Sequence, residues 1–253
     1  MPTTGPYGAD EGFREEDRAV TGDFTQLREL ALAANLALPR YGLVTLTWGN
    51  ASAIDHDRGV VAIKPSGVAY DALSLADIVV VELEDGRVIE GDRRPSTDTP
   101  THLALYREFE ALGGIVHTHS TWATVWAQAQ RQIPVYGTTH ADLCATPIPV
   151  TRQLTEAEID DGYELHTGTV LIEALAGTSP EEVPCALVRG HAPFAWGATA
   201  AKAVENAVTL EEVARMAFLT ATLAPSAPPL DDAVRRKHHE RKHGPRAYYG
   251  QPA

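Results

Sequence analysis

Apolar side chains recur at helical spacing near the start of the chain and form short segments after it. Between residues 24 and 40 they fall every three or four positions, which predicts an amphipathic helix that ends at Tyr41-Gly42. Turn residues then separate four β-like segments, at residues 44–47, 51–54, 60–63 and 78–83. The chain is therefore predicted to begin with one helix followed by a run of short strands.

Helices and strands alternate in the rest of the chain. Pro is favourable at the first position of a helix, so Thr99-Pro100 predicts a helix that runs to residue 109. A strand over residues 115–119 follows, and Ser120 is placed to cap a helix that runs through residue 130. The later predictions are strands at 147–151 and 186–188, helices at 170–175 and 199–223, a Pro-rich linker at 224–229 and a charged helix from 230 to about 242.

Short strands in runs, with helices before, between and after them, indicate an α/β fold. We expect a single-domain αβα sandwich with a central, mainly antiparallel sheet. Residues 1–23 combine Gly and acidic residues with little apolar periodicity, so they are expected to be a disordered extension. The catalytic domain is then expected to span residues 24–253.

Charge and cysteine content narrow the function. A net charge of -13 argues against broad binding to nucleic acid or to an anionic membrane, but not against a small phosphorylated ligand. Cys144 and Cys185 are too few for a disulfide framework and are expected to be free thiols in a reducing compartment. Because no apolar run is long enough to span a membrane and no signal-peptide core is visible, we expect a cytoplasmic protein.

Two histidines two residues apart are the first candidates for chemistry. On a strand, His117 and His119 would point to the same face, where two imidazoles can share one metal ion. Asp98 precedes a predicted helix, and His191 follows a predicted strand. Three imidazoles and a carboxylate suit Zn²⁺, with Mn²⁺ or another divalent ion as alternatives. The spacing also fits polar residues on a solvated strand face, with Asp98 as a helix cap.

Candidate anion donors and proton-transfer groups lie near turns. The Lys64-Pro65-Ser66-Gly67 turn offers a charge, a hydroxyl and backbone N–H groups, and Ser96 and Thr97 add two hydroxyls. Each of these segments, and the turn that holds Asn50, also fits an ordinary turn. Asp142 suits either a general base or a helix cap, and Tyr248 and Tyr249 suit surface aromatics. These residues indicate a metal-dependent hydrolase or lyase but do not identify its substrate.

Seven segments, taken together and in order, resemble one known family. The segments are Thr45 to Asn50, Ile63 to Gly67, Asp98 to His102, Gly113 to Ser120, Gly137 to Asp142, His191 to Gly197, and Lys242 to Gln251. They are similar to the bacterial L-ribulose-5-phosphate 4-epimerases of the class II aldolase/adducin superfamily, from about Phe24 to Gln251. The resemblance implies the class II aldolase-like fold and a place in L-arabinose and pentose catabolism.

The resemblance also implies a role for individual residues. The implied metal positions, usually occupied by Zn²⁺, are Asp98, His117, His119 and His191. The implied phosphate-binding positions are Asn50, Lys64, Ser66, Gly67, Ser96 and Thr97. Asp142 and Tyr249 match an acid/base pair, His238 a further active-site histidine and Glu164 a supporting carboxylate. The family forms a four-fold symmetric homotetramer, in which Tyr249 and His238 would reach the site of a neighbouring subunit.

The implied reaction converts L-ribulose 5-phosphate into D-xylulose 5-phosphate by breaking and re-forming the C3–C4 bond, with the metal as Lewis acid. A class II sugar-phosphate aldolase, such as one acting on L-fuculose phosphate, is the main alternative. Asp98 and the Tyr248-Tyr249 tail favour the epimerase, because those aldolases usually carry Glu at the Asp98 position. A protein-binding scaffold of the adducin type would be expected to have lost the metal ligands.

Overall fold

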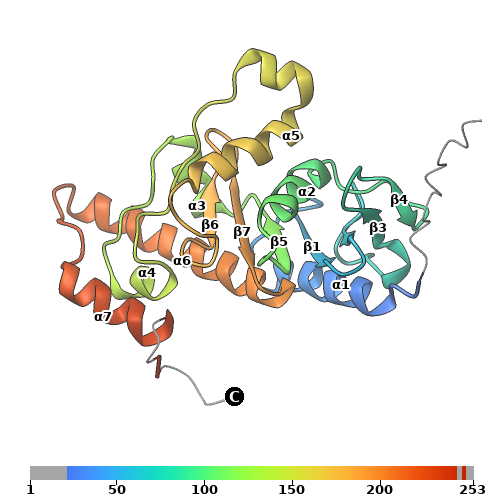
Figure 1. Cartoon of the computed structure of the whole chain (residues 1–253). Coiled ribbons are helices and arrows are strands. Elements are labelled where there is room, and N and C mark those ends of the chain that lie inside the picture. Colours follow the sequence, from blue (N-terminus) through green and yellow to red (C-terminus); the bar gives the residue numbers. More distant parts are fainter. Residues whose placement is uncertain (1–21, 244–246, 249–253) are drawn as a thin grey trace, which may run out of the picture.

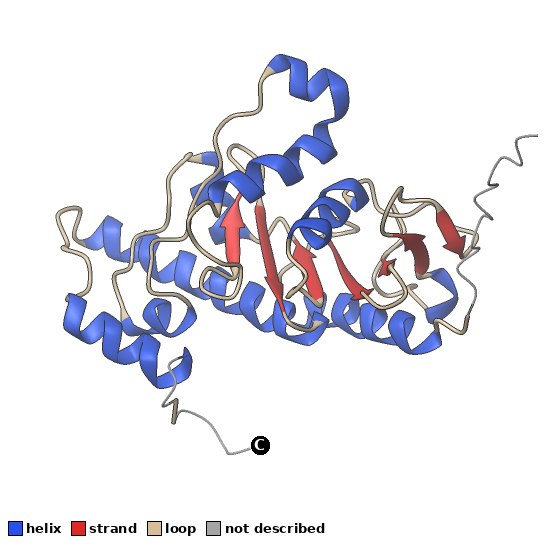
Figure 2. Cartoon of the chain, in the orientation of Figure 1, coloured by secondary structure: helices blue, strands red, loops and turns tan. Residues whose placement is uncertain are grey.

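A seven-stranded sheet forms the centre of the computed structural model, which describes residues 22–243, 247 and 248. The strand order is β4-β3-β2-β1-β5-β7-β6, and each neighbouring pair is antiparallel. The strands are β1 Asn50–Asp55, β2 Val60–Ile63, β3 Val79–Glu82, β4 Val88–Glu90, β5 Gly114–His117, β6 Cys185–Leu187 and β7 Pro193–Gly197. Figures 1 and 2 show the strands as a continuous layer between helices.

Helices cover both faces of the sheet because alternate strand residues are apolar on both sides. In β2, Val60 and Ala62 pack with α1 (Thr25–Arg40), α3 (Thr121–Gln128) and α6 (Ala200–Leu223). Val61 faces the opposite core, which is formed with α2 (Thr99–Glu108) and α5 (Glu156–Ala174). In Figure 1, α1 and α6 run below the sheet, and α2 and α5 lie above it. The predicted αβα sandwich is therefore confirmed, and its sheet is antiparallel throughout the described residues.

Shorter helices complete the fold. The 3-10 helix η1 (Leu75–Asp77) precedes β3. The helices α4 (Thr138–Leu143) and α7 (Asp232–His243) pack against each other at the end of the molecule away from β4 (Figure 1). None of the helices in the described residues is long and apolar enough to cross a membrane. Cys144 and Cys185 are free thiols, as expected, and both are buried.

The predicted strand at residues 44–47 is wrong. This segment is a loop in which Leu46 is exposed and has a φ of 54°. The loop passes close to β5: a Cβ on Gly49, whose φ is 79°, would lie 2.7 Å from the carbonyl oxygen of His117. The close approach needs a glycine with a left-handed backbone, and such a turn is incompatible with an extended strand.

Several other predicted boundaries also differ. Residues 147–151 form only isolated bridges, Ile148 with Ile133 and Val150 with Leu187. The helix predicted at residues 170–175 is the end of the longer α5, while α4, β4 and β7 were not predicted. Ser120 does occupy the N-cap of α3, but its side chain makes no capping bond. Instead, the carboxylate of Glu211 accepts hydrogen bonds from two backbone N–H groups in the first turn of α3, those of residues 122 and 123, at 2.9 and 3.0 Å.

Candidate metal centre and anion-binding cavity

Three histidines from one end of adjacent strands come together. His117 is the last residue of β5, His119 follows two residues later, and His191 lies in the turn between β6 and β7. One ring nitrogen of each lies within 4.8 Å of the others. Nε2 of His119 and Nε2 of His191 are 3.2 Å apart. The three rings therefore direct their nitrogens at a common point, although the spacing in sequence could not show that they meet.

The predicted strand that was to carry both His117 and His119 is only partly confirmed. The predicted strand 115–119 ends at His117, so His119 lies beyond it and is exposed. The two rings nevertheless have centroids 5.1 Å apart. Their convergence depends on the path of the chain as it leaves the sheet. That path brings the backbone N–H of Thr118 to 3.4 Å from the carbonyl of Pro193 at the start of β7.

Hydrogen bonds hold two of the imidazoles at Nδ1, the ring nitrogen that points away from the histidine cluster. Nδ1 of His117 donates to the carbonyl oxygen of Pro193 at 3.0 Å. Nδ1 of His191 lies 3.0 Å from the hydroxyl oxygen of Tyr163, at the kink of α5. A proton on Nδ1 leaves the lone pair of Nε2 available to a metal. Tyr163 could not be predicted from the sequence, because nothing in its local pattern shows which side chain it reaches.

The protonation states fit a cation site. Burial and the neighbouring His117 and His119 lower the pKa of His191 to about 4. Although His119 as a whole residue is exposed, partial desolvation of its imidazole and the neighbouring His117 lower its pKa below the ordinary value. Both rings are therefore neutral at neutral pH, and two facing Nε2 lone pairs repel each other unless a proton or a metal ion lies between them. The donor set of three nitrogens suits Zn²⁺.

Asp98 lies beside these histidines and does not cap its helix. It occupies the N-cap of α2, but its side chain makes no capping bond. Its Oδ2 accepts from Nδ2 of Asn50 at 2.7 Å and lies 4.0 Å from Nε2 of His117. Burial raises the pKa of Asp98, but His117, His102 and Asn50 outweigh that effect and hold it below its ordinary value. The carboxylate is therefore ionised and faces the nitrogen cluster.

The histidines and Asp98 open into one cavity of about 540 Å³. The residues predicted to bind phosphate line the same cavity: Asn50, Lys64, Ser66, Gly67, Ser96 and Thr97. Glu164 and Tyr163 also line it. The structure thus brings together eleven of the fourteen predicted site residues. They are the four predicted metal positions, the six predicted phosphate positions and Glu164.

Two turns form the part of the cavity that can bind an anion. The turn at Lys64 and the segment at Ser96 run side by side, because the backbone of Ser96 donates to the carbonyl of Lys64 at 3.0 Å. Nζ of Lys64 makes long contacts, 3.4 and 3.5 Å, to the carbonyls of Pro65 and Thr47, and lies 4.8 Å from the centroid of the Tyr70 ring. Burial lowers the pKa of Lys64 to about 8, so the amine is still mostly charged at neutral pH. A buried cation without a close carboxylate among the described residues suits an anionic ligand.

Asn50 joins the two halves of the cavity. Its Nδ2 donates to Ser96 at 2.9 Å as well as to Asp98. Its Oδ1 is buried and has no hydrogen-bond partner among the described residues. An unpaired buried carbonyl oxygen is costly, so this atom is available to a hydroxyl group of a bound ligand.

The predicted proton-transfer residues lie elsewhere in the chain. Asp142 is on α4 and His238 on α7, and neither lines the histidine cavity. Oδ1 of Asp142 lies 3.2 Å from Nδ1 of His238, and both carboxylate oxygens accept from Arg241. Burial raises the pKa of Asp142, but Arg241 and His238 outweigh it and keep the pKa below its ordinary value. Tyr249 lies outside the described residues.

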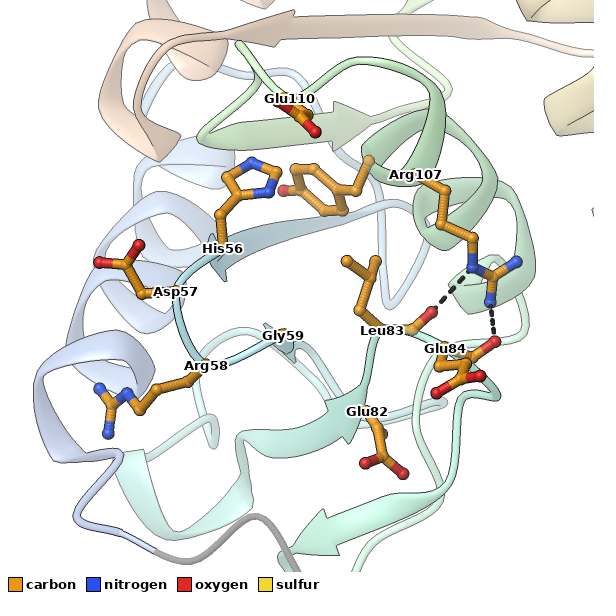
Figure 3. Close-up of a pocket in the computed structure, with 10 residues that line it drawn as sticks. His56, Asp57, Arg58, Gly59, Glu82, Leu83, Glu84, Arg107 and Glu110 are labelled. Atoms are coloured by element: carbon orange, nitrogen blue, oxygen red, sulfur yellow. Dashed lines mark hydrogen bonds between the residues drawn. The ribbon is translucent and has the colours of Figure 1, made fainter. Parts of the chain in front are cut away.

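A larger cavity, of about 870 Å³, lies away from this site (Figure 3). Its charged lining residues include Glu82, Glu84 and Arg107. The guanidinium of Arg107 donates to the carbonyls of Leu83 and Glu84 at 2.8 Å, as the dashed lines in Figure 3 show. This cavity shares no lining residue with the histidine cavity. Size alone therefore does not identify the chemical site.

Known proteins resemble this chain in sequence and in fold. The family described as Class II Aldolase and Adducin N-terminal domain matches residues 29–218. The L-ribulose-5-phosphate 4-epimerase UlaF of Salmonella paratyphi B (strain ATCC BAA-1250 / SPB7) is 56% identical over 226 residues, 89% of this chain and 99% of that protein. The protein of the same name from Salmonella typhi has the same identity and coverage.

Two solved structures superpose over most of the chain. An L-fuculose 1-phosphate aldolase has a TM-score of 0.73 and 22% identity, over 88% of this chain and 98% of that one. The L-fuculose 1-phosphate aldolase from Glaciozyma antarctica PI12 has a TM-score of 0.70 and 19% identity, over 88% of this chain and 84% of that one. At these identities the likeness shows the fold alone.

Proposed function

Because this chain belongs to the class II aldolase and adducin family, we propose that its histidine cavity is a metal-dependent active site that epimerises L-ribulose 5-phosphate to D-xylulose 5-phosphate at C4. The observation that carries the proposal is the convergence of three imidazole nitrogens beside a buried lysine in one cavity. The 56% identity to proteins named L-ribulose-5-phosphate 4-epimerase supports the choice of substrate.

The residues that would hold the cation are His117, His119 and His191, with Asp98 next to them. When bound, a divalent cation, Zn²⁺ or alternatively Mn²⁺, supplies a Lewis acid for the negative charge that develops as the C3–C4 bond breaks. The neutral imidazoles of His119 and His191 and the ionised carboxylate of Asp98 are already in the protonation states that metal binding requires.

The anion-binding turns would hold the phosphate of the sugar. Lys64 supplies the charge, and Ser66, Ser96 and Thr97 supply hydroxyl donors, with backbone N–H groups near Gly67. Retro-aldol cleavage leaves this phosphate on the aldehyde fragment, so the phosphate contacts keep the fragment in the cavity. The aldehyde can then turn its other face to the carbon nucleophile before the bond re-forms, which inverts C4.

Two proton-transfer groups are needed, one for each face of the aldehyde. Asp142 and Tyr249 are the proposed pair, with His238 beside Asp142 and Glu164 as a supporting carboxylate. One group accepts the proton of the C4 hydroxyl as the bond breaks, and the other returns a proton to the new hydroxyl.

Asp142 and His238 do not line the cavity of their own chain, which supports a proposed homotetramer with sites between subunits. In that assembly Asp142, His238 and Tyr249 act on the cavity of a neighbouring copy. We further propose that residues 24–253 form one catalytic domain in a cytoplasmic enzyme. The proposed extension at residues 1–23 lies mostly outside the described residues.

The test is a direct assay of purified protein supplied with Zn²⁺. Incubation with L-ribulose 5-phosphate is expected to give D-xylulose 5-phosphate, without accumulation of free aldehyde. A parallel incubation with L-fuculose 1-phosphate tests the aldolase alternative through the release of lactaldehyde. Release of aldehyde without C4 epimerisation would replace the proposed function by that of an aldolase.

A further inference from the structure

Helix α3 begins directly after one of the proposed metal ligands and ends beside another. His119 is followed by Ser120, the N-cap of α3, so the path of the chain into the helix sets the position of His119. In the last turn of α3, the carbonyl of Ala127 accepts from the backbone N–H of Gly190 at 2.9 Å. Gly190 immediately precedes His191. The position of α3 therefore affects both histidines, whose Nε2 atoms are 3.2 Å apart.

The turn that carries His191 has a fixed shape. Its backbone N–H donates to the carbonyl of Val188 at 3.0 Å, and Gly190 has a φ of 71°, which glycine adopts without strain. The backbone N–H of Arg189 donates to Oγ1 of the buried Thr151 at 3.0 Å. Because the turn is held in this shape, a shift of α3 would either move it or break its contact with the helix.

Two side chains hold α3 on α6, one near each end of α3. The carboxylate of Glu211 accepts from the backbone N–H groups of Trp122 and Ala123 at 2.9 and 3.0 Å. Nε1 of Trp126 donates to the carbonyl of Ala214 at 2.9 Å. On each helix these residues are three or four positions apart, so they lie on one face. Contacts at both ends restrict the sliding and tilting of α3 along α6.

Glu211 is an unusual partner for the first turn of a helix. The N–H groups of a first turn are commonly accepted by the side chain of the N-cap residue. Ser120 is a favourable residue for that role and occupies the position, but its side chain makes no capping bond. A bond from Ser120 would satisfy an N–H group without linking α3 to another element. Glu211 satisfies two of them and also fixes the helix to α6.

We propose that Glu211 is a positioning residue of the metal centre. By holding the first turn of α3 on α6, its carboxylate fixes the path of the chain that leaves His119 and, through α3, the turn that carries His191. The two imidazoles then face each other before a cation binds, which lowers the cost of ordering them. This role depends on the proposed metal site, but Glu211 itself does not line the histidine cavity.

The main test compares Glu211→Gln with Glu212→Gln. Glu211→Gln keeps the length of the side chain but leaves one oxygen for two N–H groups, so its Zn²⁺ dissociation constant is expected to rise about tenfold. Glu212 is exposed and paired with Arg215 on the same helix, so Glu212→Gln is expected to bind Zn²⁺ as the wild type does. Competition with a chromophoric chelator, well below the Tm, measures both. Wild-type affinity in Glu211→Gln would overturn the proposal.

A variant at another helix separates positioning from a general loss of stability. At the start of η1, Oγ of Ser74 donates to the carboxylate of Asp77 at 2.7 Å, and neither residue lines the histidine cavity. Ser74→Ala is expected to lower the Tm of the metal-free protein and to leave Zn²⁺ affinity unchanged. If Ser74→Ala weakened Zn²⁺ binding as much as Glu211→Gln does, a loss of stability would account for both results and the proposal would fail.

A second variant separates positioning from capping. Asn is a favourable N-cap residue and adds no charge, so Ser120→Asn combined with Glu211→Gln supplies an acceptor to α3 but no link to α6. Zn²⁺ binding is expected to stay about tenfold weaker than in the wild type. Recovery of wild-type affinity would overturn the proposal and leave Glu211 a capping role. Failure of the wild-type protein to bind one equivalent of Zn²⁺ would instead refute the proposed function, so the two failures are distinguishable.

Discussion

The hydroxyl oxygen of Tyr163 lies 3.0 Å from Nδ1 of His191, on the side of the ring away from the histidine cluster. The carbonyl of Pro193 occupies the same position relative to His117. The carbonyl can only accept, so His117 carries its proton on Nδ1 and its Nε2 is free. The hydroxyl of Tyr163 can accept the same proton from His191 when Nε2 of that ring binds a metal. The orientation of the cluster thus depends on residues that would not themselves bind a metal.

The first prediction concerns this contact. Tyr163→Phe keeps the ring but removes the hydroxyl that forms a hydrogen bond with Nδ1 of His191, so the imidazole loses its fixed orientation. Zn²⁺ affinity is expected to fall by about tenfold or more, as measured by chelator competition. Tyr41→Phe is a matched control, because Tyr41 is 61% exposed and lies outside the cavity. Equal affinity in Tyr163→Phe and Tyr41→Phe would remove Tyr163 from the site.

The second prediction concerns Lys64. The Lys64→Met variant is expected to bind Zn²⁺ normally but to show a KM for L-ribulose 5-phosphate at least about tenfold higher, because a phosphate loses a charged partner. Lys202→Met serves as the control, since Lys202 is exposed and paired with Glu205. A normal KM in Lys64→Met would show that the phosphate binds elsewhere.

The charge of Lys64 also predicts a pH dependence. Burial lowers its pKa to about 8, so the amine of the free protein loses its proton as the pH rises through that value. The wild-type kcat/KM is therefore expected to fall above about pH 8, and Lys64→Arg is expected to shift that fall to higher pH. A profile that is the same in both proteins would exclude Lys64 as its source.

The third prediction concerns stability in acid. His140 is 3% exposed, its Nε2 donates to the carbonyl of Thr146, and burial lowers its pKa from 6.5 to about 4. Between these values the unfolded chain takes up a proton that the folded protein does not. The free energy of unfolding must therefore fall as the pH falls, by up to about 1.4 kcal/mol per pH unit for this residue.

Urea unfolding of metal-free protein at several pH values measures this slope. His140→Gln removes the titrating group, so its unfolding free energy is expected to fall less steeply between about pH 6.5 and pH 4. If the unfolding free energy of His140→Gln fell as steeply with pH as that of the wild type, His140 would take up its proton in the folded protein over the same pH range as in the unfolded chain.

The fourth prediction tests the shared site. Asp142→Asn is expected to retain the metal and lose about 10²–10⁴ in rate, because a general base is removed. His119→Asn is expected to be inactive through loss of the metal. Co-expression of the two variants in one cell should restore activity, up to about a quarter of the wild type, because some sites then combine an intact cavity with an intact Asp142 of a neighbour.

Complementation of this kind requires that the two residues act from different chains. No recovery of activity in mixed oligomers, whose composition is checked with two affinity tags, would contradict the proposed site between subunits. Recovery would also fix the assignment of Asp142 to the cavity of a neighbouring copy.

The sequence predicted well those features that depend on local patterns. A short apolar run located β2, and the Pro after Thr99 located the start of α2. The ordered motifs selected the histidines and the two turns that the structure brings into one cavity. Features that depend on the path of the chain were missed, such as the loop at Leu46, which turns because Gly49 packs against the end of β5.

Tyr163 was missed for a related reason. A tyrosine beside a kinked helix is unremarkable until its partner, His191, is known. A contact across 28 residues of sequence cannot be read from spacing.

In the proposed function, epimerisation requires one divalent cation held by His117, His119 and His191. Metal-free protein should be titrated with Zn²⁺ while the conversion of L-ribulose 5-phosphate to D-xylulose 5-phosphate is followed. The rate is expected to rise in proportion to added metal and to stop rising at one equivalent per chain. Conversion at the full rate in protein that contains no metal would contradict the requirement for a cation.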